Sequence, residues 1–373
     1  MYSKKICHVT SVHSRYDTRI FFKEGKSLSK NGYDTTILVN DLNHDEVIEG
    51  IKIYSTQNQR KHSFISILKS LIIIKKKIEH IDAYVYHLHD PELLLLVRFL
   101  KKKKKIVIFD SHEDYFSTVG KTEWIPRIFR RLILLIYKYF ERYCISTIDG
   151  AIVCYHWTYD RYVKINMNSE LVFNFPQTEP LIPVSFKYNT RSIAFAGGVN
   201  SLWCHTEVLC ALSIIDDVQY ELAGPADSQY LLELHKMRGW SSVRYHGKVA
   251  FEEVFTKIYA NCSIGIALLD YIPACKGTIG NLSNTKLFEC MYAGLPVICT
   301  DFDLWKEIIE QENCGICVNP HNIDQIVSAI TYLLDNPNIA KQMGENGRNA
   351  VLKKYNWGTE EKKLFDFYDR VLN

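Results

Sequence analysis

The chain has 373 residues, of which 47% are hydrophobic and 23% are charged. At roughly 150 residues per domain this length predicts two domains, and the composition excludes an intrinsically disordered chain. The sequence lacks the roughly 18 consecutive uncharged apolar residues of a membrane-spanning helix and the apolar core of an N-terminal signal peptide, so we expect a cytoplasmic protein.

Charge differs between the two halves of the chain. Over residues 1–190, 29 Lys and Arg face 20 Asp and Glu, whereas over residues 191–373 there are 22 acidic and 16 basic side chains. A basic N-terminal half predicts an anionic partner, either nucleic acid or an anionic membrane surface.

The eleven cysteines are scattered along the chain, which indicates free thiols in a reducing compartment. Cys314 and Cys317 form a C-x-x-C pair, but a second Cys or His pair does not lie nearby in the sequence. We expect them to be two small buried side chains.

Short apolar runs alternate with amphipathic stretches through the first half of the chain. Strands are predicted at 5–9, 34–39, 51–54, 83–88, 105–110 and 150–154, with helices at 21–31, 63–79, 91–101 and 125–145. Strands rich in Val and Ile without polar alternation are typical of a parallel sheet covered on both faces.

Three prolines after residue 174 break this pattern and predict a linker over residues 176–190. A second series of strands follows at 192–196, 219–223, 243–246, 264–269, 296–300 and 315–318. The predicted fold class is therefore α/β, with two doubly wound Rossmann-like domains, 1–175 and 191–356, facing a central cleft. The final amphipathic helix, 357–373, can pack on either domain, and we assign it to the first.

Two polar clusters follow neighbouring predicted strands, and parallel strands would bring both to one rim. They contain His87, His89 and Asp90, then Asp110, His112 and Glu113. Three interpretations stay open: a metal centre; structural caps and core histidines, with Asp90 as the N-cap before Pro91; or a rim that contacts sugar or phosphate through one functional histidine. We favour the third and expect no metal.

A helix is predicted to begin near Thr285, after two good N-cap residues, Ser283 and Asn284. Free backbone N–H groups and the positive dipole end make such a helix start a site for a diphosphate. Lys286 in the first turn opposes the dipole unless an anion lies between them, and Glu289 is one turn further on, within reach of an attached ribose. The alternative is an ordinary capped helix with Lys286 and Glu289 in solvent.

The glycine pair Gly197–Gly198 ends the first strand of the second half and allows either the close approach of a ligand or a plain tight turn. The G-x-G-x-x-G fingerprint and the P-loop are both missing from the sequence, which disfavours hydride transfer and nucleoside triphosphate hydrolysis.

Four segments of the chain resemble family 4 glycosyltransferases of the GT-B fold. They are residues 11–24 with 30–33, His87-Leu-His-Asp, Phe109-Asp-Ser-His-Glu-Asp, and 286–298 with 307–309. The resemblance implies a nucleotide diphosphate sugar bound mainly by the C-terminal domain. It also implies transfer of the sugar with retention of anomeric configuration, without a metal or another cofactor.

The resemblance also implies roles for individual residues. Glu289 would accept hydrogen bonds from the ribose, Ser283 to Lys286 would offer backbone amides to the diphosphate, and Lys286 would neutralise charge on the leaving group. His112 would face the donor sugar, and Asp17 would lie at the cleft mouth or cap the following helix. The catalytic pair is thus His112 and Lys286; the donor-binding set is Gly197, Gly198, Asn281, Ser283, Asn284, Thr285, Lys286 and Glu289; the acceptor or cleft rim is Asp17, His87, His89, Asp90 and Glu113.

Two departures from the family pattern bear on activity. Asn281 stands where the family often has a Glu that contacts the donor sugar. The family also places an Arg and then a Lys after the glycine strand, and residues 199–205 contain neither. An enzyme with a weakened diphosphate clamp and a catalytically silent relative both remain open, as does an epimerase or hydrolase on the same scaffold.

The N-terminal half contains a run of five lysines at 101–105, and the stretch 127–140 places cations beside apolar and aromatic residues. A helix of this kind can lie on an anionic membrane surface or be an ordinary core helix with a solvated face. In the first case we expect a glycan or lipid-linked oligosaccharide acceptor, as in bacterial surface polysaccharide assembly, and no nucleic-acid partner.

Overall fold

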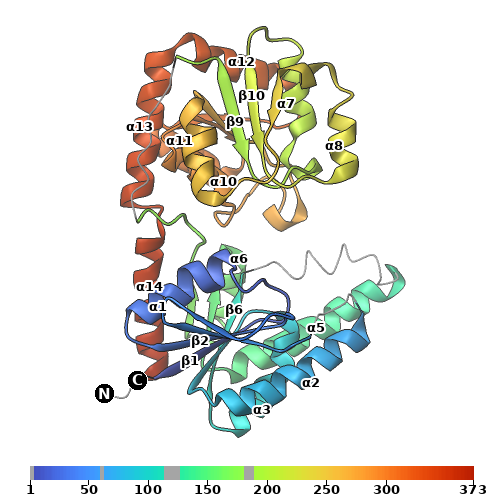
Figure 1. Cartoon of the computed structure of the whole chain (residues 1–373), viewed down its shortest axis with the longest axis vertical. Helices are drawn as coiled ribbons and strands as arrows, with labels where there is room; N and C mark the ends of the chain where they lie inside the picture. The colour runs from blue at the N-terminus through green and yellow to red at the C-terminus, as the bar shows by residue number, and fades with distance from the viewer. Residues whose placement is uncertain (1–3, 59–62, 113–126, 180–188) are drawn as a thin grey trace. The chain divides into compact units, whose positions relative to one another are not determined.

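The computed structural model describes residues 4–58, 63–112, 127–179 and 189–373. Contacts divide the chain into two compact units (Figure 1): unit 1 is Met1–Asn174 with Gly358–Asn373, and unit 2 is Phe175–Trp357. Each unit is built on a largely or wholly parallel sheet with helices on both faces. The predicted class, two doubly wound α/β domains, is confirmed.

Unit 1 contains an eight-stranded sheet in the order β3-β4-β2-β1-β5-β6-β7-β8, in which the described strand pairs are parallel apart from the antiparallel pair β3–β4. Its central strands are buried because both faces of the sheet are covered. The strands are β1 (Lys5–Val9), β2 (Asp34–Val39), β3 (Glu46–Ile48), β4 (Ile51–Ser55), β5 (Val85–Leu88), β6 (Ile106–Ser111), β7 (Gly150–Val153) and β8 (Ser169–Leu171).

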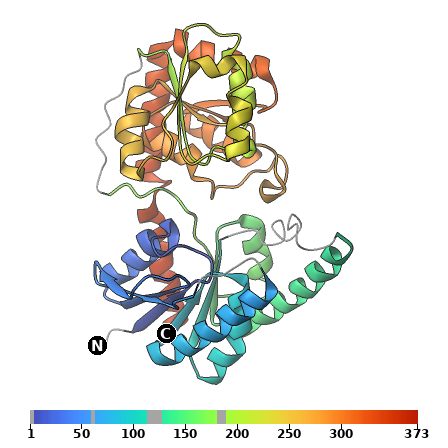
Figure 2. The ribbon, with the colours of Figure 1, turned by 45° about the vertical axis from the view of Figure 1, so that its right-hand side comes forward.

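Helices cover the two faces of this sheet unequally. On one face α2, α3 and α5 enclose a core that contains Leu71, Leu100 and Cys144 (Figures 1 and 2). On the other face lie α1 and α14, with a smaller core around Phe21 and Ile37. The helices are α1 (Lys26–Lys30), α2 (Phe64–Ile81), α3 (Val97–Lys102), α5 (Arg127–Thr147), α6 (His156–Tyr162) and α14 (Trp357–Leu372).

Two predicted helices of unit 1 have a different form in the structure. The helix expected at 21–31 begins earlier, as a π-helical segment Thr18–Gly25 that continues into α1. Asp17 starts it by accepting hydrogen bonds from the backbone N–H groups of Arg19 (2.8 Å) and Ile20 (2.9 Å). The helix expected at 91–101 begins as a 3₁₀ segment, Pro91–Leu96, before α3. The short edge strands β3 and β8 were not predicted, because three residues are too few for a clear pattern.

Unit 2 contains a six-stranded parallel sheet in the order β11-β10-β9-β12-β13-β14. Its strands are β9 (Ser192–Ala196), β10 (Gln219–Ala223), β11 (Val243–Tyr245), β12 (Ile264–Ala267), β13 (Val297–Thr300) and β14 (Gly315–Val318). Its helices are α7 (His205–Leu212), α8 (Ser228–Leu234), α9 (Phe251–Glu253), α10 (Thr285–Tyr292), α11 (Asp303–Glu312), α12 (Ile323–Asp335) and α13 (Pro337–Lys353).

The last helix, α14, belongs to unit 1 although the chain enters it from unit 2. Its Phe367 and Tyr368 side chains are fully buried, and the Tyr368 hydroxyl lies 2.9 Å from Nδ1 of His87. Within the described ranges, the helices all lack the combination of length and apolar character needed to cross a membrane.

His205, the first residue of α7, provides a test of how dry the core of unit 2 is. Its side chain is fully buried, its ring packs against Phe195, and its Nδ1 lies 3.0 Å from the Tyr220 hydroxyl. Burial lowers the pKa of His205 to about 3, so the folded protein keeps this imidazole neutral while the unfolded chain protonates it below about 6.5.

We therefore expect His205 to destabilise unit 2 as the pH falls below 6.5 and toward 3, because only the unfolded state gains the proton there. Between these two pH values the free energy of unfolding falls by up to about 1.4 kcal/mol per pH unit. Urea unfolding at pH 7, 6, 5 and 4 should show a shallower loss of stability for His205→Gln than for the parent chain. The matched control His44→Gln, at an exposed position, should keep the parent slope. Equal slopes for His205→Gln and the parent would contradict a dry His205 site.

Candidate functional site

The carboxyl ends of β9 and β12 mark the place in unit 2 where the strand order changes direction. From β9 the sheet continues to β10 and β11 on one side and to β12, β13 and β14 on the other. Ligands of doubly wound sheets bind at such positions. Gly197 and Gly198 follow β9, and the segment after β12 leads into α10. The structure thus places the two predicted donor segments at one edge of the sheet.

The loop before α10 is held by Asn281. Its side-chain oxygen accepts hydrogen bonds from the backbone N–H groups of Ser283 (3.0 Å) and Asn284 (3.1 Å), and its backbone oxygen accepts one from the Trp305 indole (2.7 Å). Only 5% of Asn281 is exposed. Contact of Asn281, Ser283 and Asn284 with a donor stays a prediction. The two amides already have a partner, and Asn281 supports the loop from beneath.

The first turn of α10 retains the features of an anion site. Asn284 occupies the N-cap position with an extended backbone, although among the described residues its side chain does not bond to this turn. An α-helix leaves its first N–H groups without intrahelical partners, so the N–H groups of Thr285 and Lys286 carry the positive end of the helix dipole.

Lys286 and Glu289 form an ion pair one turn apart. Nζ of Lys286 lies 2.7 Å from Oε2 of Glu289, and the two side chains are 21% and 6% exposed. Neither side chain extends into solvent as in an ordinary capped helix. The pair also explains how a lysine is tolerated in a first helical turn, because Glu289 compensates the ammonium that the dipole disfavours.

Glycine is required where β9 and β10 end beside α10. A Cβ atom at Gly197 would lie 2.9 Å from Cε of Lys286, and one at Gly224 would lie 1.7 Å from the carbonyl oxygen of Gly197. Gly224 also has a φ of +135°, which favours glycine. These glycines let Lys286 lie against the strand end. Gly224 was not predicted, since a lone glycine gives no signal in the sequence.

In unit 1 the order change falls between β1 and β5, and Asp90 lies there. It accepts hydrogen bonds from the Thr10 hydroxyl (2.9 Å) and from the Ser11 backbone N–H (2.6 Å), and its Oδ1 lies 3.4 Å from Nε2 of His13. Burial would raise the pKa of Asp90, but bonding to His13, Ser11 and Thr10 lowers it to about 2. Asp90 occupies the predicted N-cap position before Pro91, but its side chain does not bond to the following turn, because the loop after β1 takes its oxygens.

His112 lies at the end of β6 between two polar partners. Its Nε2 is 3.1 Å from Nε2 of His13, and its Nδ1 is 3.4 Å from Oδ2 of Asp110. Asp110 is fully buried, and its Oδ2 accepts a hydrogen bond from Nε of Arg19 (2.7 Å). Burial raises the pKa of Asp110, yet Arg19 and His112 outweigh that effect and hold the pKa well below its usual range. His112 therefore rests on a buried carboxylate that stays ionised.

His87 and His89 do not lie on a rim. Both are fully buried beneath it, and burial lowers the pKa of each ring, so both are neutral. Their predicted place on the acceptor or cleft rim is therefore wrong, because both side chains point from this strand into the core. Asp17 caps the segment Thr18–Gly25, and its carboxylate also lies 3.7 Å from His13. Glu113 lies outside the described residues.

His13 is the residue that sequence reasoning missed in this cluster. It joins Asp17, Asp90 and His112, three residues that were predicted separately. The signal available in the sequence was its place in the loop directly after β1, at the order change of the sheet.

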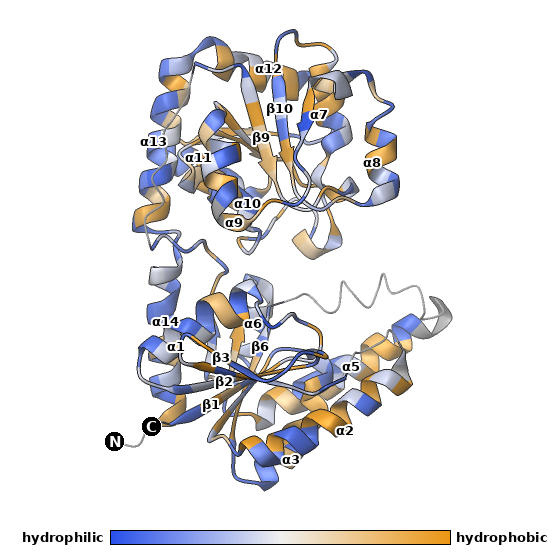
Figure 3. Cartoon of the chain, in the orientation of Figure 1, coloured by the Kyte–Doolittle hydropathy of each residue, from blue (hydrophilic) through white to orange (hydrophobic). Residues whose placement is uncertain are grey.

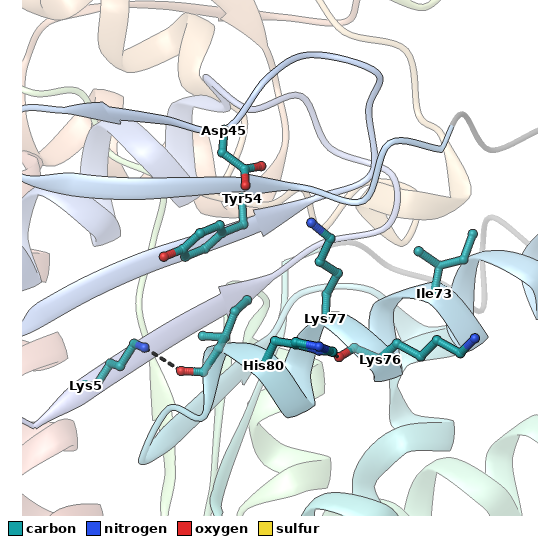
Figure 4. Close-up of a pocket in the computed structure, with 8 residues that line it drawn as sticks. Lys5, Asp45, Tyr54, Ile73, Lys76, Lys77 and His80 are labelled. Atoms are coloured by element: carbon teal, nitrogen blue, oxygen red, sulfur yellow. Dashed lines mark hydrogen bonds between the residues drawn. The ribbon is translucent and has the colours of Figure 1, made fainter.

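A separate pocket of about 440 Å³ lies between α2 and the strands of unit 1 (Figure 4). Lys5, Lys76, Lys77 and His80 line it, with Lys5 directed at the carbonyl of Ile81. None of the predicted site residues lines this pocket.

Residues 205–350 match the family model described as group 1 glycosyl transferases. An uncharacterized glycosyltransferase of Methanocaldococcus jannaschii is 25% identical over 134 residues, which cover 36% of this chain and 32% of that protein. A GDP-mannose-dependent alpha-(1-6)-phosphatidylinositol monomannoside mannosyltransferase of Mycobacterium tuberculosis is 32% identical over 79 residues, or 21% and 20% of the two chains. The matched segments thus span about a third or less of these two relatives.

Two solved structures share the fold over nearly the whole chain. Sucrose-phosphate synthase from Thermosynechococcus elongatus has a TM-score of 0.76 at 14% identity, covering 99% of each chain. Anabaena Alr3699/HepE, solved with UDP-glucose, has a TM-score of 0.70 at 10% identity, covering 98% of this chain and 99% of its own. The chain accordingly has the GT-B fold, and its residues 205–350 are similar to the group 1 glycosyl transferases.

Proposed function

We propose that the chain is a retaining glycosyltransferase that moves a sugar from a nucleotide diphosphate sugar to a glycan or lipid-linked oligosaccharide. The observation that carries this proposal is the start of α10, where Lys286 lies against Gly197 and forms an ion pair with the buried Glu289. This helix falls within the segment matched by the family. Some structural neighbours were solved with UDP or UDP-glucose.

The chemistry follows from the charges at this helix start. The N–H groups of Thr285 and Lys286, with the Lys286 ammonium, bind the diphosphate. Oxygens of Glu289 accept hydrogen bonds from the ribose hydroxyls. As the bond from the sugar to the diphosphate breaks, negative charge grows on the departing phosphate, and Lys286 stabilises it. That phosphate takes the proton of the acceptor hydroxyl as the new bond forms on the same face, so the chain supplies no separate base and the transfer step uses no cofactor.

His112 is proposed to face the donor sugar. Asp110 fixes the orientation of its ring from one side and His13 contacts it from the other. Asp17 and Asp90 lie around His13 and are proposed to border the acceptor.

Glu289→Ala tests the donor site. We expect the affinity for UDP or GDP, measured by calorimetry, to fall about 10- to 100-fold, because hydrogen bonds to a charged group contribute about 1.5–3 kcal/mol each. Glu310→Ala on α11 removes an exposed carboxylate and should leave the affinity unchanged. If Glu289→Ala binds nucleotide as the parent does while both are folded, the donor assignment is wrong.

A panel of UDP- and GDP-sugars, followed by thermal shift, identifies the donor. Binding to none of them favours a non-catalytic protein.

His112→Gln separates catalysis from binding. Turnover at saturating donor should fall about 100-fold, the usual scale for losing one group that stabilises the transition state, while nucleotide affinity changes less than about twofold. His80→Gln on α2 removes a histidine whose Nδ1 contacts the Lys76 backbone oxygen at the exposed surface, and it should match the parent. Parent-like turnover of His112→Gln would make His112 a structural residue only. Donor consumed without any acceptor would indicate hydrolysis or epimerisation in place of transfer.

We further propose that unit 1 lies on the anionic inner surface of the cell membrane, where a lipid-linked acceptor of surface polysaccharide assembly is available. Hydrophobic and hydrophilic residues alternate along α5 (Figure 3). Of its apolar side chains, Leu135 is 50%, Ile136 59% and Tyr139 66% exposed, and Lys138 and Arg142 flank them. A groove of about 540 Å³ between α3 and α5 adds Arg98 and Lys102. Such a surface pairs apolar contact with attraction to anionic headgroups.

Ile136→Glu with Tyr139→Glu tests the membrane surface. We expect sedimentation with phosphatidylglycerol-containing vesicles to fall about tenfold or more, because each buried apolar side chain contributes about 1.5–3 kcal/mol. Leu232→Glu on α8 of unit 2 replaces a side chain that is 63% exposed and should bind as the parent does. Binding that is equal for neutral and anionic vesicles, or unchanged in the double variant, would contradict this surface.

A further inference from the structure

A buried group of three histidines and one carboxylate lies in the core of unit 1, beneath the proposed rim. His8 and His87 are paired in register on the adjacent strands β1 and β5, and His89 follows His87 by two residues. Side chains two residues apart share a face of a sheet, so the three rings converge. Glu24 reaches them from the π-helical segment, and all four side chains are fully buried.

The distance of Glu24 from the rings suits a shared ion better than it suits a hydrogen bond. One nitrogen or oxygen from each residue lies within 4.8 Å of the others. Oε2 of Glu24 is 3.9 Å from Nδ1 of His8 and 3.8 Å from Nδ1 of His87, which exceeds hydrogen-bond length. Ligand atoms about 2.0–2.2 Å from a tetrahedral zinc ion are roughly 3.3–3.6 Å apart. Nδ1 of His8 and Nε2 of His89, now 2.9 Å apart, need to separate by a few tenths of an ångström.

Glu24 is poorly hydrogen-bonded in this core. Arg19 serves two carboxylates, with Nε 2.7 Å from Asp110 and 3.0 Å from Glu24. Within the described ranges, neither oxygen of Glu24 forms a hydrogen bond, although Oε1 lies at ion-pair distance from Arg19. Buried polar and charged groups of this kind are costly unless they are paired or coordinate a metal.

The surroundings resemble a second coordination shell. Nδ1 of His89 is 3.4 Å from Oδ2 of Asp110, the arrangement in which a carboxylate orients a metal-bound imidazole. The Tyr368 hydroxyl lies 2.9 Å from Nδ1 of His87 and would have to rotate away or join the ligand shell.

We propose that His8, His87, His89 and Glu24 form a buried structural site for one divalent transition-metal ion, with zinc as the best-matched ion. Three imidazoles and one carboxylate supply nitrogen and oxygen ligands that zinc accepts in four-coordinate sites. Because all four side chains are fully buried, the ion has no open position for substrate and joins β1, β5 and the segment Thr18–Gly25. It is separate from the transfer step.

The first experiment needs no variant. Tag-free full-length protein is stripped with chelator and titrated with zinc against a chromophoric chelator, and bound metal is counted by mass spectrometry. We expect one zinc per chain. Cobalt(II) titrated into the stripped protein should give the visible absorption of a tetrahedral nitrogen–oxygen site. Less than a tenth of an equivalent of zinc, together with no cobalt spectrum, would overturn the proposal.

Variants then locate the ion. Glu24→Gln and His87→Gln should each lower zinc affinity at least about 100-fold and abolish the cobalt spectrum. His321→Ala should leave both unchanged; it removes a ligand from the second possible cluster, Cys204, Glu207 and His321 in unit 2. His112→Gln should also retain the ion, although His112 belongs to a third possible group with His89 and Asp110. Loss of zinc in His321→Ala or His112→Gln, with retention in Glu24→Gln, would place the metal elsewhere and overturn the assignment.

Discussion

The ion pair between the buried guanidinium of Arg19 and Asp110 is the interaction on which unit 1 depends. The guanidinium donates to Asp110 at the end of β6 and to the backbone oxygen of Val172, and it also contacts Glu24. Removing one partner of such a buried pair typically costs about 3–5 kcal/mol. Because Asp110 in turn faces His89 and His112, one cation fixes the ionised carboxylate that orients both rings. The proposed catalytic rim and the histidine core thus both depend on Arg19.

In unit 2, neutral groups hold the loop that precedes the proposed donor site. Asn281 closes the loop before α10 and is itself held by the Trp305 indole. The ion pair of Lys286 and Glu289 then lies beside a strand end that only glycine permits. The segment after β9 lacks the Arg and Lys that family 4 glycosyltransferases usually have there, so Lys286 is the cation proposed to bind the diphosphate. This is why the charge at the helix start carries so much of the proposed chemistry.

The sequence predicted the architecture well because parallel strands with both faces covered give continuous apolar runs, as in β1, β5 and β13. The sequence also singled out Lys286 and Glu289, which form an ion pair because a spacing of three residues on a helix brings them together. Their role in donor binding stays a prediction. The sequence could not predict which polar groups would already be satisfied. Asp90 reads as a helix cap, yet it is bound by Thr10 and Ser11, about eighty residues earlier in the chain.

Local patterns likewise could not show that His8, His87 and Glu24 meet. Register between β1 and β5 places the two rings side by side, and an eight-residue π-helical segment turns Glu24 toward them. Register and helix type depend on the packing of the whole unit, which no short window of sequence contains.

The position of α14 has a consequence for synthesis of the protein on the ribosome. Phe367 and Tyr368 complete the core of unit 1, but they are translated after all of unit 2. Domains usually fold in the order in which they emerge. Here the first unit to emerge keeps one sheet face partly uncovered until α14 has left the exit tunnel, whereas unit 2 has its complete set of strands earlier. We therefore expect a chaperone to bind that apolar face of the nascent chain during elongation.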